Sequence, residues 1–514
     1  MSIDFRDEAD AKHEFANFVE LLSHRAKNQS KQKAYSFLKN GETEIESLTY
    51  QELQIKAQAI ATSLQSLKVY GERALLLYQP GLDFIAAFLG CLYAGVIAVP
   101  AYPPRKNQNL SSKTIVVGWL PVFHDMGLIG NVLQPLYLGV PCVLMSPVDF
   151  LQKPMRWLQA ISHYKATTSG GPNFAYDLCI RKATPEELEN LDLSSWEVAF
   201  TGAEPIRAET LEKFTSTFAS CGFHKQAFYP CYGMAETTLI VSGGEKTALP
   251  ITCDLEPTAL EQNRVVKVKD STSDARTIVG CGQSPTEQKV VIVNPESLTL
   301  CLPNQIGEIW VAGASVAQGY WNNPEQTEKT FHAYLADTKE GPFLRTGDLG
   351  FLQDGELFIT GRLKDVIIIR GQNHYPQDIE LTVENSHPSL RLGCGAAFAI
   401  DFKGSERLVI VHEVERSYLR KLNVQEVVDT IRQAVVAQHG LQVFATSLIK
   451  PGSIPKTSSG KIRRHYGLDS SAAVGLTGDL EDWLETEIDP TLLYDYPTVE
   501  AIVKHLSLEI NAKN

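Results

Sequence analysis

Thr346-Gly-Asp-Leu-Gly350, followed by Gly361-Arg-Leu-Lys-Asp-Val366, is the pair of segments that decides how this chain is interpreted. The residues on either side of Asp354-Gly355 are predicted to form two strands, because Asp-Gly is a strong signal for a tight β-turn. Such a hairpin would bring Asp348 and Arg362 close together. A carboxylate can accept hydrogen bonds from a vicinal diol, and a guanidinium can reach both a sugar oxygen and a phosphate. The pair therefore suits a ribonucleotide, although an ordinary surface hairpin can carry the same charges.

The composition is that of a large globular protein. A chain of 514 residues has room for three or four domains, and an apolar content of 44% supports large cores. The net charge of −13 argues against a nucleic-acid partner, because such a partner selects a basic face.

Cysteine usage and the N-terminal residues indicate a cytoplasmic protein. The nine cysteines are scattered without a Cys-x-x-Cys pair, and their odd number excludes a complete disulfide framework. Residues 1–11 are polar and acidic, unlike a signal peptide. The uncharged run 84–102 approaches the length of a membrane span, but Gly95 and Pro100 interrupt it. We therefore expect a core helix followed by a strand, and no transmembrane segment.

The order of predicted elements indicates an α/β protein with a mainly parallel sheet up to about Val241. A strand at 74–78, a helix at 83–94 and a strand at 96–99 make a unit that builds parallel sheets. The pattern repeats, with further strands predicted at 116–120, 142–145, 166–169 and 197–200 and further helices at 126–138, 154–163 and 208–219.

After Gly243 the pattern changes to short strands and turns, which predicts a β-rich subdomain with strands at 290–293, 307–311, 350–352 and 356–360. A small α+β domain is then predicted, with strands at 366–369, 396–400 and 408–414 and a helix at 424–438 that Gly440 ends. The tail shows the apolar spacing of short amphipathic helices. The expected domains are a large N-terminal domain (1–360), a small mobile C-terminal domain (361–465) and a short helical tail (466–514).

Three further segments can carry chemistry. Pro455-Lys-Thr-Ser-Ser-Gly-Lys-Ile-Arg-Arg464 is glycine- and hydroxyl-rich, as phosphate-binding loops are, although a basic linker has the same composition. Tyr229-Pro-Cys-Tyr-Gly-Met-Ala-Glu-Thr-Thr238 offers an aromatic face, a carboxylate and hydroxyls. Thr201-Gly-Ala-Glu-Pro205 is a tight turn after a buried strand. The last two fall where strands end, the place where open α/β sheets bind ligands.

The order of these segments resembles the adenylate-forming superfamily of acyl-CoA synthetases, luciferases and peptide-synthetase adenylation domains, from about residue 45 to 464. The five ordered motifs are Thr201–Pro205, Tyr232–Thr237, Arg345–Gly350, Gly361–Val366 and Pro455–Arg464. Finer features resemble its fatty acyl-AMP ligase branch, namely residues 120–128, 279–282, 316–321 and 370–376 and the connection 330–343.

The resemblance implies a nucleotide site. Asp348 would hold the ribose hydroxyls, and Arg362 the ribose and phosphate side. Tyr232 would stack on adenine. The other nucleotide-binding positions would be Gly202, Ala203, Glu204, Gly233 and Met234.

The resemblance also implies catalytic roles and the cofactors ATP and Mg²⁺. Glu236 would ligate Mg²⁺, and Thr237 would touch the α-phosphate. Lys461 would reach the fatty-acid carboxylate and the α-phosphate, because placed charges are the main device of such chemistry. His124 would line the entrance for the acyl carboxylate, or else be a core histidine. Lys364 would lie at the hinge where the small domain rotates between half-reactions.

The tail resembles an acyl carrier protein. Gly467-Leu-Asp-Ser-Ser471 is similar to the attachment signature, with Ser470 as the implied site of 4′-phosphopantetheine, and Tyr494-Asp-Tyr-Pro-Thr498 follows at a suitable place. Position 471 is usually a bulkier apolar residue. The implied partners are a fatty acid and an acyl carrier protein or a downstream polyketide or peptide synthase.

Two stretches that the family carries are missing. Between Arg105 and Thr114 only residues 106–113 stand in place of the lysine-bearing loop that holds the β- and γ-phosphates. After Arg464 the carrier's linker and first helix are absent. Without these stretches, apolar faces are expected to be exposed, and one edge of a sheet is expected to lack its neighbouring strand.

The resemblance implies a fatty acyl-AMP ligase that passes its acyl group to a carrier thiol. The alternatives are a long-chain acyl-CoA synthetase and a shortened, inactive adenylate-binding or scaffolding protein.

Overall fold

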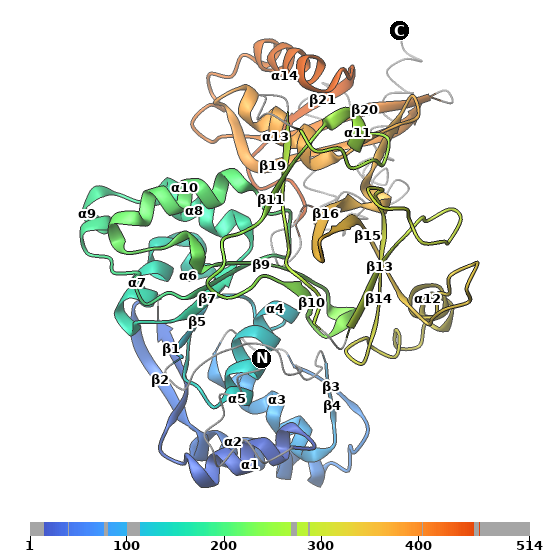
Figure 1. Ribbon diagram of the computed structural model, residues 1–514. Coiled ribbons are helices and arrows are strands. Elements are labelled where there is room, and N and C mark those ends of the chain that lie inside the picture. Colours follow the sequence, from blue (N-terminus) through green and yellow to red (C-terminus); the bar gives the residue numbers. More distant parts are fainter. Residues whose placement is uncertain are drawn as a thin grey trace, which may run out of the picture. The chain divides into compact units, whose positions relative to one another are not determined.

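The computed structural model describes residues 15–39, 41–76, 81–99, 114–268, 275–285, 288–402, 405–456 and 462. Contacts divide the chain into two compact units, and Figure 1 labels most of their elements. Unit 1 comprises residues 1–256, 267–346 and 350–359, and unit 2 comprises residues 257–266, 347–349 and 360–514. The chain thus passes from one unit to the other several times.

Unit 1 is organised around an eight-stranded sheet with the order β10-β9-β8-β7-β5-β6-β1-β2. The pairs from β1 through β6, β5, β7 and β8 to β9 are parallel, and only the edge strands β2 and β10 are antiparallel to their neighbours. The strands are β1 (Lys33–Lys39), β2 (Thr43–Thr49), β5 (Val116–Gly118), β6 (Cys142–Met145), β7 (Thr168–Gly171), β8 (Val198–Thr201), β9 (Phe228–Gly233) and β10 (Ile240–Gly243). The predicted α/β architecture is confirmed.

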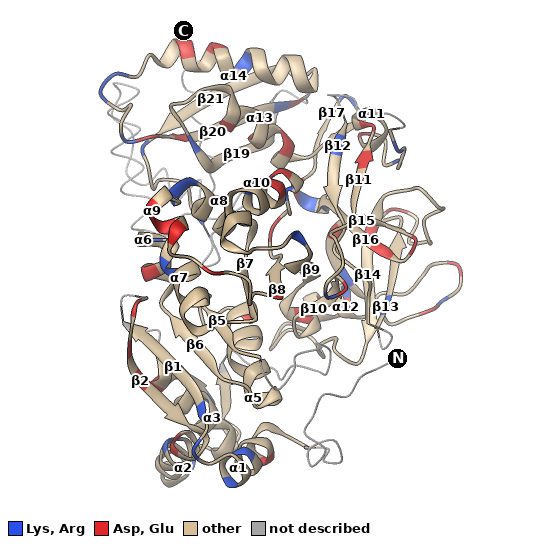
Figure 2. Ribbon diagram, turned by 60° about the vertical axis from the view of Figure 1, so that its left-hand side comes forward, with Lys and Arg blue, Asp and Glu red and all other residues tan. Residues whose placement is uncertain are grey.

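The large sheet is buried on both faces. Successive side chains of a strand point to opposite faces, and Val116 belongs to one apolar cluster while Val117 belongs to another. Strands buried on both faces are expected to be apolar throughout, and Figure 2 shows β5, β7 and β8 free of charged residues. The helices of this part are α1 (Phe18–Asn28), α2 (Tyr50–Ser66), α3 (Leu82–Ala94), α6 (Pro147–Gln152), α7 (Met155–Tyr164), α8 (Asn173–Lys182), α9 (Pro185–Glu189) and α10 (Ala208–Phe218).

The helix predicted over 126–138 is divided into three pieces. Two α-helical pieces, α4 (Asp125–Gly127) and α5 (Gln134–Leu138), flank the π-helix η1 (Leu128–Leu133). Apolar spacing predicts that a segment is helical. It does not reveal a π-helical turn within the helix, because such a turn leaves the composition of the segment unchanged.

The first predicted strand–helix–strand unit exists but stands apart from the large sheet. Strands β3 (Arg73–Leu75) and β4 (Ile97–Val99) pair in parallel as a two-stranded sheet of their own. Ile97 is 42% exposed. Among the described strands no third one joins this pair, and the exposed isoleucine fits the sheet edge expected where the family carries further strands.

Most of the predicted hairpin lies in the β-rich part of unit 1, while its residues 347–349 and 360–362 are counted with unit 2. The four-stranded sheet β13-β14-β15-β16 comprises Gln288–Val293, Gly307–Gly313, Leu344–Gln353 and Glu356–Arg362. Asp354 and Gly355 have φ values of 53° and 83°, as a two-residue turn of type I′ requires. Close by in sequence are β11 (Thr252–Leu255), its partner β12 (Arg276–Val279) and α12 (Pro324–Phe331).

Unit 2 contains an α+β core. Strand β20 pairs antiparallel with β19 and parallel with β21. Helices α13 and α14 bury Ile379 and Ile431 against this sheet. The elements are α11 (Pro257–Leu260), β17 (Ile367–Ile369), β18 (Gln372–His374), α13 (Pro376–Ser386), β19 (Leu390–Phe402), β20 (Ser405–Val414), α14 (Val424–His439) and β21 (Val443–Ile449).

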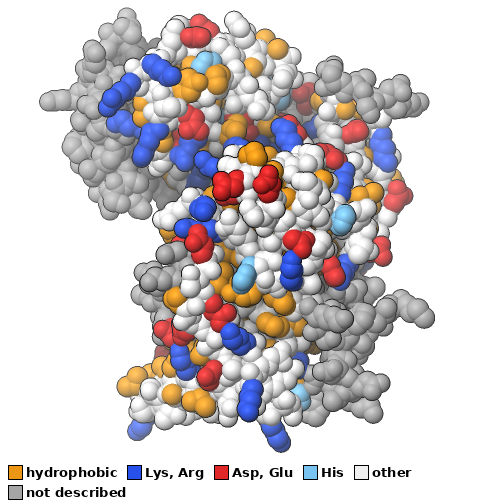
Figure 3. All heavy atoms as spheres, turned by 90° about the vertical axis from the view of Figure 1, so that its left-hand side faces the viewer, with side chains coloured by type: hydrophobic (Ala, Val, Ile, Leu, Met, Phe, Trp, Pro, Cys, Tyr) orange, Lys and Arg blue, Asp and Glu red, His pale blue; other side chains and the backbone are white. Residues whose placement is uncertain are grey.

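The structure can be compared with the predictions about the cysteines, about membrane-spanning segments and about surface charge. All nine cysteines lie in the described residues, and none forms a disulfide. Among the described helices, none combines the length and the apolarity needed to cross a bilayer. On the face shown in Figure 3, acidic and basic side chains both occur across the described surface. The predicted helices of the tail lie outside the described residues.

Candidate active site

The predicted adenine slot lies where two neighbouring strands of unit 1 end. Strands β8 and β9 are parallel, with Thr201 opposite Pro230. Residues 202–204 follow β8, and Tyr232 and Gly233 close β9. Because the strands run side by side in one direction, the two segments come together at the same edge of the sheet, which is the ligand-binding edge of open α/β sheets.

Packing fixes both sides of this slot. A side chain on Gly202 would place its Cβ 2.6 Å from the carbonyl oxygen of Cys231, so only glycine allows the approach. Tyr232 is half-buried against the apolar cluster that contains Val241 and Ile309. One part of its ring is thus held by the protein, while the ring is not fully enclosed.

The carboxylate of Glu204 already has a structural partner. Its Oε1 accepts a hydrogen bond of 2.6 Å from the backbone N–H of Phe174, in the first turn of α8. A carboxylate is stabilised there by unpaired amides and the helix dipole. Ala203, before it, has φ +66°, a strained backbone for alanine. Glu204 thus holds the turn against the start of α8.

Glu236 is positioned by a tyrosine that sequence reasoning did not single out. Its Oε1 accepts a hydrogen bond of 2.8 Å from the Tyr320 hydroxyl, and its carbonyl accepts one from Ala317 N–H. Burial, and then the neighbouring carboxylate, raise the pKa of Tyr320. The tyrosine therefore stays a hydrogen-bond donor and fixes one oxygen of Glu236.

A single fixed carboxylate fits Mg²⁺ that arrives with ATP. Mg²⁺ in nucleotide sites is held by one or two carboxylates together with substrate phosphates. Within the described residues no group of three or more His, Cys, Asp or Glu could hold a metal without such help. Thr237, next in sequence, is buried, and its hydroxyl donates to the carbonyl of Met234 at 3.0 Å.

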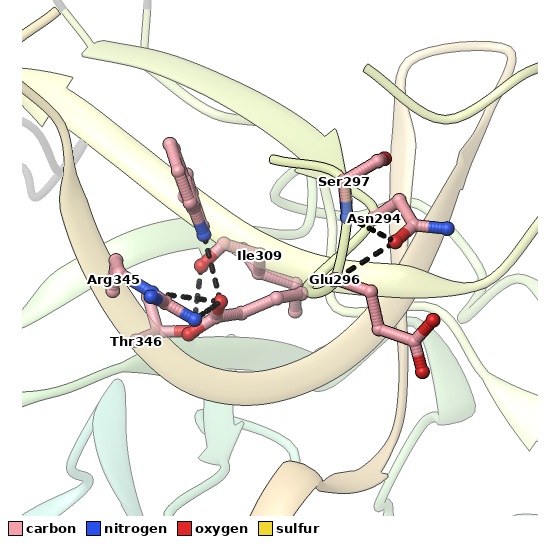
Figure 4. Close-up of polar contacts among 8 residues, drawn as sticks. Asn294, Glu296, Ser297, Ile309, Arg345 and Thr346 are labelled. Carbon is pink, nitrogen blue, oxygen red and sulfur yellow. Dashed lines mark hydrogen bonds and ion pairs between the residues drawn. The ribbon is translucent and has the colours of Figure 1, made fainter. Parts of the chain in front are cut away.

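An ion pair between a half-buried arginine and a buried carboxylate fixes the strand that leads to the Thr346-Gly-Asp segment (Figure 4). Nε and Nη2 of Arg345 lie 3.0 and 2.7 Å from Oε2 of Glu308, whose side chain is 2% exposed. The indole N–H of Trp310 donates to the same oxygen at 2.9 Å. The Thr346 hydroxyl donates to the Ile309 carbonyl at 2.7 Å. Strand β15 is thus joined to β14 by side chains as well as by the ladder.

The same view shows a turn that ends β13. Oδ1 of Asn294 accepts from the N–H groups of Glu296 and Ser297 at 2.9 and 3.1 Å (Figure 4). Asparagine side chains commonly satisfy turn amides in this way.

His124 is neither a core histidine nor free. Its side chain is 23% exposed, with Nδ1 2.6 Å from Oδ1 of Asp125. The same Oδ1 accepts a hydrogen bond of 2.7 Å from the Met126 N–H, and His124 occupies the N-cap position of α4. The structure therefore places it at the start of α4, the short helix that precedes the π-helix η1.

In unit 2, the structure brings together the two residues on which the sequence interpretation began. Nε of Arg362 lies 3.2 Å from Oδ1 of Asp348. Asp348 is buried, whereas the Arg362 side chain is 51% exposed. The hairpin therefore juxtaposes the acid and the guanidinium as expected. Lys364, the predicted hinge residue, is exposed in the 3₁₀ turn Leu363–Asp365.

Two predicted site residues, Lys461 and Ser470, lie outside the described residues, as does the shortened stretch 106–113. Lys456 and Ile462, which stand on either side of residues 457–461, form an antiparallel bridge.

Comparison with known proteins identifies the family. The model for AMP-binding enzymes matches residues 22–111 and 104–321. The model for the AMP domain of Disco-interacting protein 2-like proteins matches residues 364–471, and that for the phosphopantetheine attachment site matches residues 459–506. The chain therefore belongs to the AMP-binding enzyme family, in its fatty acyl-AMP ligase branch, and it ends in a carrier-like segment.

Three relatives define this placement. The medium-chain-fatty-acid–[acyl-carrier-protein] ligase JamA of Moorena producens is 46% identical over 582 residues, covering 92% of this chain and 97% of JamA. A structure from studies of fatty acyl-adenylate ligases of E. coli and L. pneumophila superposes with a TM-score of 0.78 at 28% identity, covering 88% of this chain and 96% of the other. The L. pneumophila fatty acyl-adenylate ligase in complex with acyl adenylate and pyrophosphate has a TM-score of 0.67 at 36% identity, with coverages of 88% and 96%.

The comparisons also bear on the missing stretch. The alignment with JamA extends over 582 positions, more than the 514 residues of this chain, so at least 68 positions have no residue here. The AMP-binding match is in two pieces that meet at residues 104–111. Both observations agree with the interruption expected near residues 106–113.

Proposed function

We propose that this chain activates a medium-chain fatty acid with Mg²⁺-ATP to acyl-AMP and transfers the acyl group to a phosphopantetheine thiol of an acyl carrier. The likeness to JamA, which extends over nearly the whole of both chains, carries this proposal. The carrier-like match at residues 459–506 supports a carrier thiol over free CoA as acceptor.

In the first half-reaction, a carboxylate oxygen of the fatty acid forms a bond to the α-phosphorus of ATP. The bond from that phosphorus to the bridging oxygen breaks, and pyrophosphate leaves. Tyr232 and residues 202–204 would hold adenine, and Asp348 and Arg362 the ribose. Mg²⁺, when bound, would neutralise phosphate charge beside Glu236, whose orientation the Tyr320 hydroxyl fixes. Lys461 would stabilise the charge that develops during attack.

In the second half-reaction, the thiol sulfur forms a bond to the acyl carbonyl carbon and AMP leaves. His124, at the start of α4, would lie at the entrance used by the acyl carboxylate. Ser470 would carry the phosphopantetheine arm.

A second candidate is a protein that binds an acyl adenylate without making it. The interruption near residues 104–111 favours it, because the family's loop for the β- and γ-phosphates belongs there. Binding of a non-hydrolysable acyl-AMP mimic without turnover would support this alternative.

The deciding experiment measures acyl-AMP formation by the purified chain with Mg²⁺-ATP and a medium-chain fatty acid. We expect acyl-AMP from the wild type, and a loss of about 10²-fold or more for Lys461→Ala, as found when a charge-stabilising group is removed. Lys421→Ala, which removes an exposed lysine of unit 2, serves as the control and should retain activity.

The acceptor is tested in the same reaction with CoA or a carrier protein added. Acyl-CoA formed as fast as acyl-carrier would favour the acyl-CoA synthetase alternative. A folded wild type that forms no acyl-AMP would exclude the proposed function.

A further inference from the structure

The start of α8 holds the turn that follows β8 in two places. Oε1 of Glu204 accepts a hydrogen bond from the Phe174 N–H at 2.6 Å, and Oδ1 of Asn173 accepts one from the Arg207 N–H at 3.0 Å. Asn173 and Phe174 are the first two residues of α8. One end of a single helix thus fixes the middle and the far end of the segment 202–207, which carries part of the predicted adenine slot.

Asn173 is itself held by a buried polar network. Its Nδ2 donates to Oγ1 of Thr210 at 3.1 Å and to Oδ2 of Asp177 at 3.2 Å. The Thr210 hydroxyl donates in turn to Oδ1 of Asp177 at 2.9 Å. Asn173 and Thr210 are both buried. A flip of the amide would turn its N–H groups toward the Arg207 N–H, so the network fixes which way Asn173 points.

The backbone of the turn has reason to be held. Ala203 has φ +66°, and a non-glycine residue keeps such a conformation only where its surroundings impose it. Gly202 approaches the Cys231 carbonyl so closely that a Cβ would lie 2.6 Å from the oxygen. The Tyr176 hydroxyl, also on α8, donates to the Phe200 carbonyl at 2.9 Å and so holds the end of β8. Helix α8 therefore supports the turn from its first residue to its last.

We propose that Asn173 is a positioning residue for the adenine base, and that Asp177 and Thr210 set its orientation. The inference rests on the proposed function in one respect, namely that residues 202–204 form the base-binding turn. Adenine is separated from the α-phosphorus by the ribose, so its contacts are the same in the ground state and in the transition state. A displaced turn therefore weakens nucleotide binding and leaves the chemical step unchanged.

The test uses two variants of the network and one matched control, all in the full-length chain. Asn173→Ala removes the acceptor for the Arg207 N–H. Thr210→Val removes only a hydroxyl and keeps the shape of the side chain, so it carries the test should Asn173→Ala fail to fold. Thr215→Val makes the same change on the same helix, α10, where the half-buried hydroxyl donates to the Leu211 carbonyl at 2.8 Å within the helix.

Binding of a non-hydrolysable acyl-AMP mimic is measured first, because it requires no turnover. Asn173→Ala and Thr210→Val should bind the mimic about tenfold more weakly than the wild type, and Thr215→Val as tightly. In acyl-AMP formation, the KM for ATP should rise by a similar factor in both network variants while kcat stays the same. A merely structural defect gives the opposite pattern, because unfolding of some molecules lowers the apparent kcat and leaves KM unchanged.

Hydrogen exchange tests the support of the turn itself. Amide exchange in peptides covering residues 202–207 should be faster in Asn173→Ala and Thr210→Val than in the wild type, with peptides of α7 unchanged. Unchanged exchange there, equal affinity of Thr210→Val and wild type for the mimic, or a loss of kcat at constant KM would overturn the inference. A wild type that binds the mimic but forms no acyl-AMP would instead sink the proposed function alone, and one that binds no mimic would sink both.

Discussion

At the scale of single residues, the pair of Glu308 and Arg345 makes a sharp prediction about stability. The guanidinium places two N–H groups on one carboxylate oxygen and lies over the Trp310 ring, with 5.5 Å from its carbon to the ring centroid. The ammonium group of lysine is a point charge and cannot reproduce the planar pair of N–H donors of a guanidinium. Arg345→Lys should therefore lower the free energy of unfolding by about 1–3 kcal/mol, the usual cost of losing a hydrogen bond to a buried charge. Urea unfolding followed by tryptophan fluorescence measures it. Arg432→Lys, at an exposed pair 3.9 Å from Asp429, should change little, and equal midpoints for the two variants would contradict the argument.

Residue-scale prediction from sequence succeeds where partners are close in the chain. Asp348 and Arg362 flank one hairpin, so the turn signal alone brings them together, and the structure places them 3.2 Å apart. Glu236 and Tyr320 are far apart in sequence, and their hydrogen bond depends on the tertiary fold. Tyr320 lies within the segment 316–321 that the resemblance emphasised, but nothing in that spacing indicates a carboxylate partner.

At the scale of elements, strand β20 makes unit 2 sensitive to acid. His412 is fully buried, its Nδ1 is 2.9 Å from the Glu413 carbonyl, and burial lowers its pKa below the ordinary value. Glu384, Glu413 and Lys456 are the charged groups that act on it. Below about pH 6.5 the unfolded chain binds a proton that folded His412 does not, so stability falls as pH drops from there toward the folded pKa. Between pH 7.5 and 5.5 the unfolding midpoint of the wild type should fall. His412→Gln should reduce that fall, whereas a substitution of His332, the exposed residue that follows α12, by Gln should not. A fall unchanged by His412→Gln would count against this account.

Helices and strands can be predicted from the sequence where each has a local pattern of its own. The predicted strand 142–145 is β6, and the helix predicted over 208–219 is α10 within one residue. The hairpin of β1 and β2 was not predicted. It completes one edge of the large sheet through the parallel pairing of β1 with β6, a long-range contact that local patterns do not encode. The isolated pair of β3 and β4 likewise depends on which other strands the chain retains.

At the scale of the whole molecule, the chain joins an AMP-binding enzyme to a carrier-like segment. A phosphopantetheine arm is a long flexible thiol, and tethering it to the enzyme raises its effective concentration at the place where acyl-AMP is made. A chain of this kind would load its own tail in preference to a free carrier. The relevant residues, 463–514, lie outside the described residues, so this expectation comes from the family match and the Gly467–Ser471 signature.

The tail therefore provides a test with a control built into the sequence, because two serines stand side by side. Treatment with CoA and a phosphopantetheinyl transferase should add the mass of one phosphopantetheine to the wild type and to Ser471→Ala, but not to Ser470→Ala. Addition of ATP and a fatty acid should then add the acyl mass, at a rate that does not change on dilution of the protein if the chain loads its own arm. A rate proportional to protein concentration would mean that one molecule loads another. Modification of Ser470→Ala but not of Ser471→Ala would move the attachment to Ser471, and a wild type that never gains mass would show that the segment is not a working carrier.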